Sequence, residues 1–156
     1  IVGGRFLYLP DTLRGKSRSD SGYRHNVEHT LSTLENHPIT HGLPAAFPMT
    51  DELYLSEVFT DSIEPLLASD YDFTRDNFYS ATKAVMDGKM FDNEGWEHPD
   101  GSNIVGWVKH YRNSPIAYLP VGAHPEAYSS VNYRQLLQNT IHWAASDTAL
   151  DWARQR

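Results

Sequence analysis

Two side chains that can exchange protons lie close together near the end of the chain. His124 and Glu126 are two residues apart in the segment GAHPE, which directly follows the apolar run PIAYLPV at residues 115–121. A neighbouring carboxylate can fix the tautomer of an imidazole and stabilise its protonated form. This segment is therefore the first candidate for acid/base chemistry.

Two adjacent carboxylates, Asp51 and Glu52, form a second candidate. In a strand they point to opposite faces, so only one of them can face a pocket. That residue could act as an acid, a base or a ligand for hydroxyl groups. An equally good interpretation is structural: Asp51 caps a turn and Glu52 forms an ion pair on the surface.

The segment at residues 86–103 reads as a long loop that mixes aromatic and acidic side chains around Trp96. Such a surface can stack on a sugar ring and bind its hydroxyls, although an ordinary lid has the same composition. His98 with Glu94 or Glu97 could bind a divalent cation, but no HExxH or comparable pattern supports a metal site. We predict no cofactor and assign no metal ligand, and leave a divalent cation open.

Three further aromatic side chains favour structural roles. His37, which precedes Pro38, either reaches a pocket or hydrogen-bonds its own loop, and we favour the loop. Trp107 lies within an apolar strand pattern and Trp143 within a helical one, so both are predicted to be core residues.

Composition excludes several classes of function. The chain has 156 residues, 40% of them hydrophobic, and a formal net charge of −7 with scattered basic residues, which offers no continuous surface for nucleic acid. No apolar run approaches the roughly 20 residues that cross a bilayer, and no secretion signal opens the chain. We expect one soluble domain over residues 1–156, cytoplasmic by preference, with neither nucleic acid nor membrane as partner.

A catalytic triad cannot be completed within this chain. It contains no cysteine, which removes disulfides, thiolate catalysis and cysteine metal sites. Ser102 and Ser129 do not lie in a GxSxG elbow, and we interpret both as loop or cap residues. Acid/base chemistry therefore remains as the candidate.

Local patterns predict the elements that must position these residues. Alternation predicts strands at residues 24–34 and 52–58, with His25, Val27 and His29 on one face of the first. A hairpin is expected from residues 104–110 and 115–121, and a helix capped by Ser129 or Ser130 should follow. We expect short helices or turns at residues 63–67 and 74–85, a helix stop at Gly3-Gly4, and a solvated loop over DTLRGKSRSDSG.

The stretch HPITHGLPAAFPMTDELY at residues 37–54 resembles the ThuA-like family of trehalose utilisation. There a helix-breaking HPIT, a GLP turn and an acidic DELY follow one another at this spacing. The family belongs to the class I glutamine-amidotransferase-like superfamily. The resemblance implies a flavodoxin-like, three-layer α/β fold, of which this chain matches the C-terminal part and lacks the N-terminal strands.

The resemblance also assigns roles. In the superfamily, a histidine and a glutamate after a strand end supply the catalytic base and its orienting partner, which implies these roles for His124 and Glu126. Glu52 becomes a third catalytic candidate, and substrate contacts are expected at Asp51, Trp96 and His37. The nucleophile turn of the superfamily is missing, so glutamine amidotransferase activity is not expected.

These roles imply an enzyme that acts on a carbohydrate or its oxidised derivative. The alternative is a non-catalytic module that binds a sugar or a partner, or one part of a larger assembly. In that case a homo-oligomer, or a partner that supplies the missing strands, would cover the exposed sheet edge and apolar face.

Overall fold

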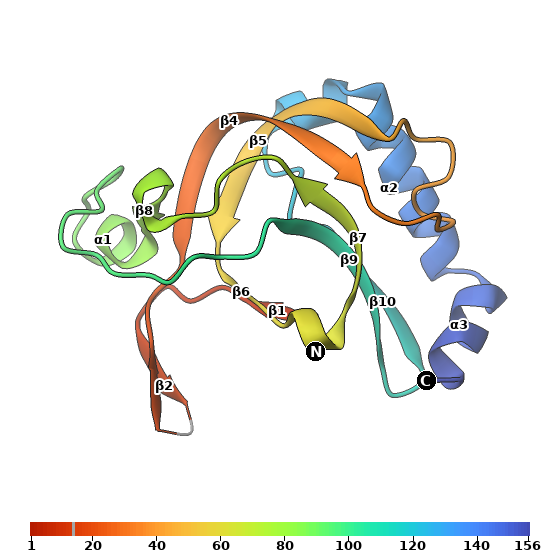
Figure 1. Ribbon diagram of the computed structural model, residues 1–156, viewed down its shortest axis with the longest axis horizontal. Coiled ribbons are helices and arrows are strands. Elements are labelled where there is room, and N and C mark those ends of the chain that lie inside the picture. The colour runs from red at the N-terminus through yellow and green to blue at the C-terminus, as the bar shows by residue number, and fades with distance from the viewer. Residues whose placement is uncertain (14) are drawn as a thin grey trace.

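The fold is built around a curled sheet whose longest strands arch across the molecule (Figure 1). The computed structural model describes residues 1–13 and 15–156. In spatial order the sheet contains β10 (Ser114–Tyr118), β9 (Ile104–Tyr111), β7 (Glu64–Ser69), β4 (Gly22–Thr33) and β5 (Ala46–Leu55), and β8 (Tyr79–Ser80) also pairs with β4. The predicted mixed α/β class is confirmed.

All the pairings in this sheet that the described residues form are antiparallel. The predicted hairpin is confirmed as β9 and β10, joined by a turn in which Arg112 has a φ of 54°. Antiparallel neighbours need only such short connections, whereas parallel strands need a crossover of a dozen or more residues. The predicted strand after residue 51 begins earlier than expected, at Ala46. Pro48 is tolerated because β5 is an outer strand, where a missing N–H costs no ladder hydrogen bond.

A β-bulge in β4 changes which side chains share a face. Arg24 pairs with Leu53 of β5 and Val27 with Asp51, so two residues of β4 oppose the single residue Glu52. Asn26 within this bulge has a φ of 53°, in the left-handed region that asparagine tolerates better than most residues. The prediction that His25 and His29 share a face is therefore wrong: His29 points into the core and His25 lies on the side of Glu52.

Of residues 63–67, predicted as a short helix or turn, residues 64–67 belong instead to strand β7 (Glu64–Ser69). The register of β7 against β9 shifts twice near Leu67, and Leu66 and Leu67 are both buried. These irregularities remove the alternation by which a strand is recognised from sequence. The segment 74–85 is mixed, with a 3₁₀ turn η2 (Arg75–Asn77), β8 and a short helix α1 (Ala81–Met86).

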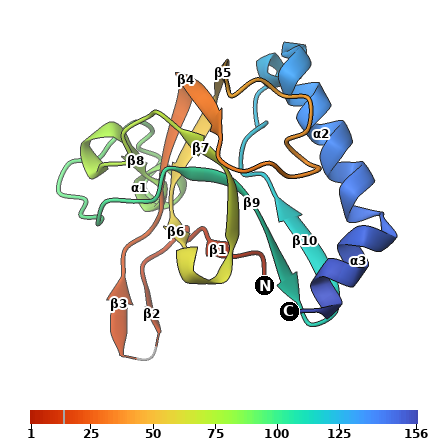
Figure 2. The same cartoon turned by 45° about the vertical axis from the view of Figure 1, so that its right-hand side comes forward.

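The N-terminal segment also differs from expectation. Gly4 does not end a helix: β1 (Gly4–Arg5) pairs with β6 (Glu57–Val58), and η1 (Thr60–Ser62) follows. The predicted solvated loop forms a hairpin of β2 (Asp11–Leu13) and β3 (Lys16–Arg18), which projects from the molecule (Figure 2). Arg14, within that predicted loop, lies outside the described residues.

Two helices lie along one side of the sheet, next to β10 (Figure 2). The predicted helix is confirmed as α2 (Val131–Ala144), where the Ser130 hydroxyl accepts a hydrogen bond from the backbone N–H of Tyr133 at 3.3 Å. Tyr133, Leu136 and Trp143 are its buried residues, whereas Ile141 is 65% exposed. Ser146 caps a separate helix, α3 (Asp147–Arg154), and does not continue α2.

The core lies between the inner face of the sheet and these helices. Alternate residues of β5 from Phe47 to Leu55 enter it, together with Leu31 of β4 and Leu136 of α2. Each fully buried side chain of this kind contributes roughly 1.5–3 kcal/mol. Trp107 and Trp143 are 2% and 5% exposed, which confirms both as core residues. Among the described residues, no helix has the length and apolar character to span a bilayer.

Candidate functional site

The loop after β10 is held in place by a buried carboxylate. Asp51, fully buried in β5, accepts hydrogen bonds from three consecutive backbone N–H groups, those of Gly122, Ala123 (3.1 Å) and His124 (3.2 Å). Gly122 has a φ of 101°, and a β-carbon there would lie 1.7 Å from the hydroxyl oxygen of Tyr133. Only glycine fits this turn. The position of His124 therefore depends on Asp51 and Gly122.

His124 and Glu126 form the pair that the sequence predicts. The imidazole Nδ1 of His124 lies 3.4 Å from a carboxylate oxygen of Glu126, the second residue of the 3₁₀ turn η3 (Pro125–Ser129). The His124 side chain is 28% exposed and that of Glu126 is 66% exposed. Water screens the electrostatic attraction of such an exposed pair, so the pair adds little stability. The role of Glu126 here is to orient the imidazole ring.

A second histidine, not predicted as a site residue, approaches the first. The bulge at Asn26 turns His25 toward β5, and its Nε2 lies 3.1 Å from Oε1 of Glu52. The ring centroids of His25 and His124 are 6.1 Å apart. We call His25, Glu52, His124 and Glu126 the histidine–glutamate cluster. Two imidazole–carboxylate pairs from distant segments thus meet at one place.

Aromatic side chains surround this cluster. Burial, together with the nearby carboxylate of Glu52, raises the pKa of Tyr54, so this phenol stays protonated. The rings of Tyr23 and Phe91 lie 5.1 Å and 5.7 Å from that of His25. These residues give the cluster an apolar border on the His25 side.

Two residues with a left-handed backbone lie at the same place, whereas a third lies in the turn between β9 and β10. Asn26, Phe91 and Arg112 are the non-glycine residues with positive φ in the described part of the chain. Asn26 directly follows His25, and the ring of Phe91 contacts it. Strained residues persist where the surrounding structure holds them, and they gather at functional sites. This distribution is independent support for placing the site at the cluster.

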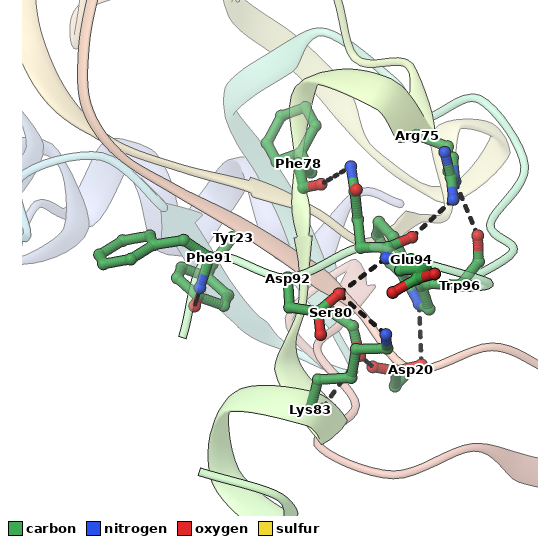
Figure 3. Close-up of polar contacts among 11 residues, drawn as sticks. Asp20, Tyr23, Arg75, Phe78, Ser80, Lys83, Phe91, Asp92, Glu94 and Trp96 are labelled. Atoms are coloured by element: carbon green, nitrogen blue, oxygen red, sulfur yellow. Dashed lines mark hydrogen bonds and ion pairs between the residues drawn. The ribbon is translucent and has the colours of Figure 1, made fainter. Parts of the chain in front are cut away.

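The predicted substrate contacts have other partners in this structure. Both carboxylate oxygens of Asp51 accept backbone hydrogen bonds. Trp96 is 6% exposed, and its indole N–H donates to Asp20 at 2.9 Å (Figure 3). His37 accepts a hydrogen bond from the Ile39 N–H through Nδ1, and burial lowers its pKa. Substrate contact by these residues stays a prediction, and their geometry shows structural roles.

The loop residues weighed as cation ligands do not converge. His98 has its Nδ1 2.6 Å from the carbonyl oxygen of Pro99, and its ring lies 5.4 Å from that of Trp96. Within residues 1–13 and 15–156, no group of three or more histidine, aspartate or glutamate side chains is arranged to hold a metal ion.

A separate cavity of about 360 Å³ is lined in part by Tyr54 and Val121, and none of the four cluster residues lines it. Aromatic rings make up much of its wall, including Phe6, Trp107 and Tyr118. Tyr54 lies beside the carboxylate of Glu52 and also lines this cavity. The aromatic character of the wall would suit a ligand with an apolar face.

Comparison with known proteins agrees with the resemblance in residues 37–54. A crystal structure of a ThuA-like protein from Parabacteroides merdae is similar over 92% of this chain, with 18% sequence identity and a TM-score of 0.51. The chain spans 50% of that protein's length, and this likeness shows a shared fold. No curated protein sequence matches the chain. The ThuA family model, described as trehalose utilisation, matches residues 1–144, and the chain therefore belongs to the ThuA family.

Proposed function

We propose that the chain carries a site for acid/base chemistry on a sugar or an oxidised sugar, with His124 as the general base. The observation that carries this proposal is the meeting of two imidazole–carboxylate pairs, His25 with Glu52 and His124 with Glu126, at a 6.1 Å separation of the rings. All four side chains are partly exposed, so a ligand can reach them.

The geometry divides the roles. His124 directs Nδ1 toward Glu126, which leaves Nε2 to take a proton from a substrate hydroxyl or from a carbon next to a carbonyl. Glu126 then stabilises the imidazolium, and the same nitrogen returns the proton later in the reaction. Glu52, held between His25 and Tyr54, is placed to accept a hydrogen bond from a substrate hydroxyl.

The family supports a sugar as the substrate class, since its description is trehalose utilisation. The surroundings of the cluster agree with this choice. Carboxylates and imidazoles bind hydroxyls, and the exposed ring of Phe91 provides an apolar surface beside them. The proposal also includes the association of the chain as a homo-oligomer or with a partner that supplies the missing strands. It does not specify which sugar is bound.

A non-catalytic role in sugar or partner binding is the second candidate. It is favoured by the exposure of the cluster, because Glu126 is 66% exposed and enzymes usually exclude water from charged catalytic groups. The same residues would then bind hydroxyls without proton transfer. Turnover separates this candidate from the first.

The test measures binding and turnover of trehalose, glucose and oxidised glucosides, with NMR of the sugar to detect any product. We expect His124→Ala to abolish turnover while the circular dichroism spectrum stays unchanged. His142→Ala, on the exposed face of α2, is the matched control and should retain full activity. Binding without turnover in the wild type would select the second candidate, and neither binding nor turnover would refute both.

A further inference from the structure

Phe91 combines features that ordinary folding does not favour. Its side chain is 56% exposed although it is large and apolar, and its φ is 58°, in the left-handed region. A residue with a β-carbon costs roughly 1–2 kcal/mol in that conformation. Edge contacts with the rings of His25 and Tyr79 offset part of this cost, yet more than half of the side chain stays uncovered.

The structure nevertheless holds Phe91 firmly. Its backbone N–H donates to the hydroxyl of Tyr23 at 2.9 Å. The next residue, Asp92, accepts hydrogen bonds through Oδ1 from Lys83 Nζ at 2.9 Å and from the Glu94 N–H at 2.8 Å (Figure 3). Its carbonyl oxygen accepts the N–H of Ser80 at 3.1 Å. The strained residue is thus fixed from both sides.

The following residues extend this anchorage into the core. Arg75 donates to the carbonyl oxygens of Asn93 at 2.6 Å and Trp96 at 2.7 Å. The indole of Trp96 is in turn bound to the buried carboxylate of Asp20, which also accepts the hydroxyl proton of Ser80 (Figure 3). The loop around Phe91 is therefore a preorganised element, and its position does not depend on a ligand.

The anchored ring lies directly beside the histidine–glutamate cluster. It contacts His25 edge-on, with an interplanar angle of 84°, and His25 is paired with Glu52. A ligand over the cluster would thus meet an apolar ring on one side and hydrogen-bonding groups on the other. A pyranose ring has this division, with C–H groups on its faces and hydroxyls around its edge.

Charge disfavours an anionic ligand here. Glu52 and Glu126 are both carboxylates, and they would repel a phosphate or a carboxylate from the cluster. A wholly apolar ligand would leave the imidazoles and carboxylates without partners. A neutral, polyhydroxylated ring satisfies both parts of the site.

We propose that Phe91 is the stacking platform for a neutral sugar ring held over His25 and Glu52. This assignment rests on the proposed function and names a contact that determines affinity. The strain at Phe91 and its exposure are then explained together, because the bound sugar covers the ring. The neighbouring exposed residues Val85, Met86 and Met90 suggest the competing occupant, a protein partner that covers the whole apolar patch.

The experiment uses the full chain and measures two quantities: sugar affinity, by titration calorimetry, and the turnover rate. Phe91→Asn removes the ring but retains a residue that tolerates the left-handed backbone, and Phe91→Trp keeps an aromatic face. We expect Phe91→Asn to weaken sugar binding about three- to tenfold, as loss of one aromatic contact does, with kcat nearly unchanged. Phe91→Trp should bind within about twofold of the wild type.

Met86→Ala is the control, because Met86 is 61% exposed on the same patch and belongs to α1. It should leave sugar affinity unchanged. Equal affinity of Phe91→Asn and the wild type would refute the platform while leaving the proposed function intact, and equal losses in Phe91→Asn and Met86→Ala would favour the partner surface. No sugar binding by the wild type would refute the proposed function and the platform together.

Discussion

The backbone N–H of His124 lies 3.2 Å from Oδ1 of Asp51, a carboxylate fully buried in the outer strand of the sheet. The same carboxylate accepts the two preceding N–H groups of the loop. Asp51 is therefore a positioning residue: it acts on the site through the backbone that carries His124. Asp51 and Glu52, adjacent in sequence, serve the same site from opposite faces of β5.

Asp51→Asn should loosen this loop. The amide keeps the size of the side chain, but it replaces an oxygen acceptor by an N–H₂ donor that faces backbone donors. We expect a loss of about 2–3 kcal/mol in the free energy of unfolding, since hydrogen bonds to a buried charge are involved. Urea denaturation measures it, with Asp76→Asn, 83% exposed, as the control. Equal stability of Asp51→Asn and the wild type would contradict the anchoring role.

Glu52→Gln tests the carboxylate of the cluster. The amide can still hydrogen-bond His25 and Tyr54, so the fold should be retained. The negative charge is lost, which weakens the hydrogen bond that Glu52 accepts from the substrate hydroxyl, and we expect kcat/KM to fall roughly tenfold. Steady-state kinetics compare kcat/KM of Glu52→Gln with that of the wild type. The control is Glu28→Gln, because Glu28 is an exposed residue of β4. Unchanged kcat/KM in Glu52→Gln would exclude Glu52 from the chemistry.

Part of this site could be predicted from the sequence because the relevant signals are local. His124 and Glu126 follow a recognisable strand, and alternation alone places Asp51 and Glu52 on opposite faces. The helix after Ser130 was predicted with its cap because capping involves residues three apart. These features require no knowledge of distant segments.

His25 and Phe91 could not be found in this way. The bulge at Asn26 is defined by the pairing of β4 with β5. The sequence of β4 alone indicates it only through an asparagine, a residue that tolerates the left-handed region. Strand β7 was missed for the same reason, since its irregular register is set by β9. The position of Phe91 depends on its hydrogen bond to Tyr23 and on those of its neighbour Asp92 with Lys83 and Ser80, which come from other segments.

Trp96→Phe separates a structural from a substrate-binding role for this residue. Phenylalanine fills most of the space but cannot donate to Asp20, whose carboxylate is 3% exposed. We expect a stability loss of about 1–3 kcal/mol from the unsatisfied acceptor, with sugar affinity unchanged. Thermal unfolding and titration calorimetry measure the two quantities. Weaker sugar binding with unchanged stability would instead support the substrate contact predicted from the sequence.

Stability should fall as the pH drops below about 6.5 because of His29. Burial lowers the pKa of this histidine in the fold, although Asp51 and Asp70 partly oppose the shift. The unfolded chain therefore binds the proton more readily, so stability is fully present above the unfolded pKa of 6.5 and is lost as the pH falls from there toward the folded value. We expect a decrease of about 1 kcal/mol between pH 7.5 and 5.5.

Urea denaturation at pH 7.5, 6.5 and 5.5 measures this dependence. His37, whose pKa burial also lowers, acts in the same direction, so His29→Gln should reduce the slope without abolishing it. His142→Gln, at an exposed position of α2, is the control and should keep the wild-type slope. A slope unaffected by His29→Gln would show that His29 does not carry this dependence.

Tyr23→Phe tests whether the anchorage of Phe91 matters for the ligand. The variant removes the hydroxyl that accepts the Phe91 N–H and leaves the ring beside His25 in place. One hydrogen bond of this kind contributes about 1 kcal/mol, so we expect exchange of the Phe91 amide hydrogen to accelerate about fivefold. Sugar affinity should fall by a smaller factor than in Phe91→Asn, because the platform is loosened but still present.

Hydrogen exchange followed by NMR reports on the loop, and calorimetry reports on the sugar. Tyr111→Phe, at a tyrosine that is 44% exposed at the end of β9, is the matched control and should change neither quantity. If Tyr23→Phe accelerates exchange at Phe91 but binds the sugar like the wild type, the fixed position of the ring is not what determines affinity. A parallel loss of both would tie the strained backbone at Phe91 directly to ligand binding.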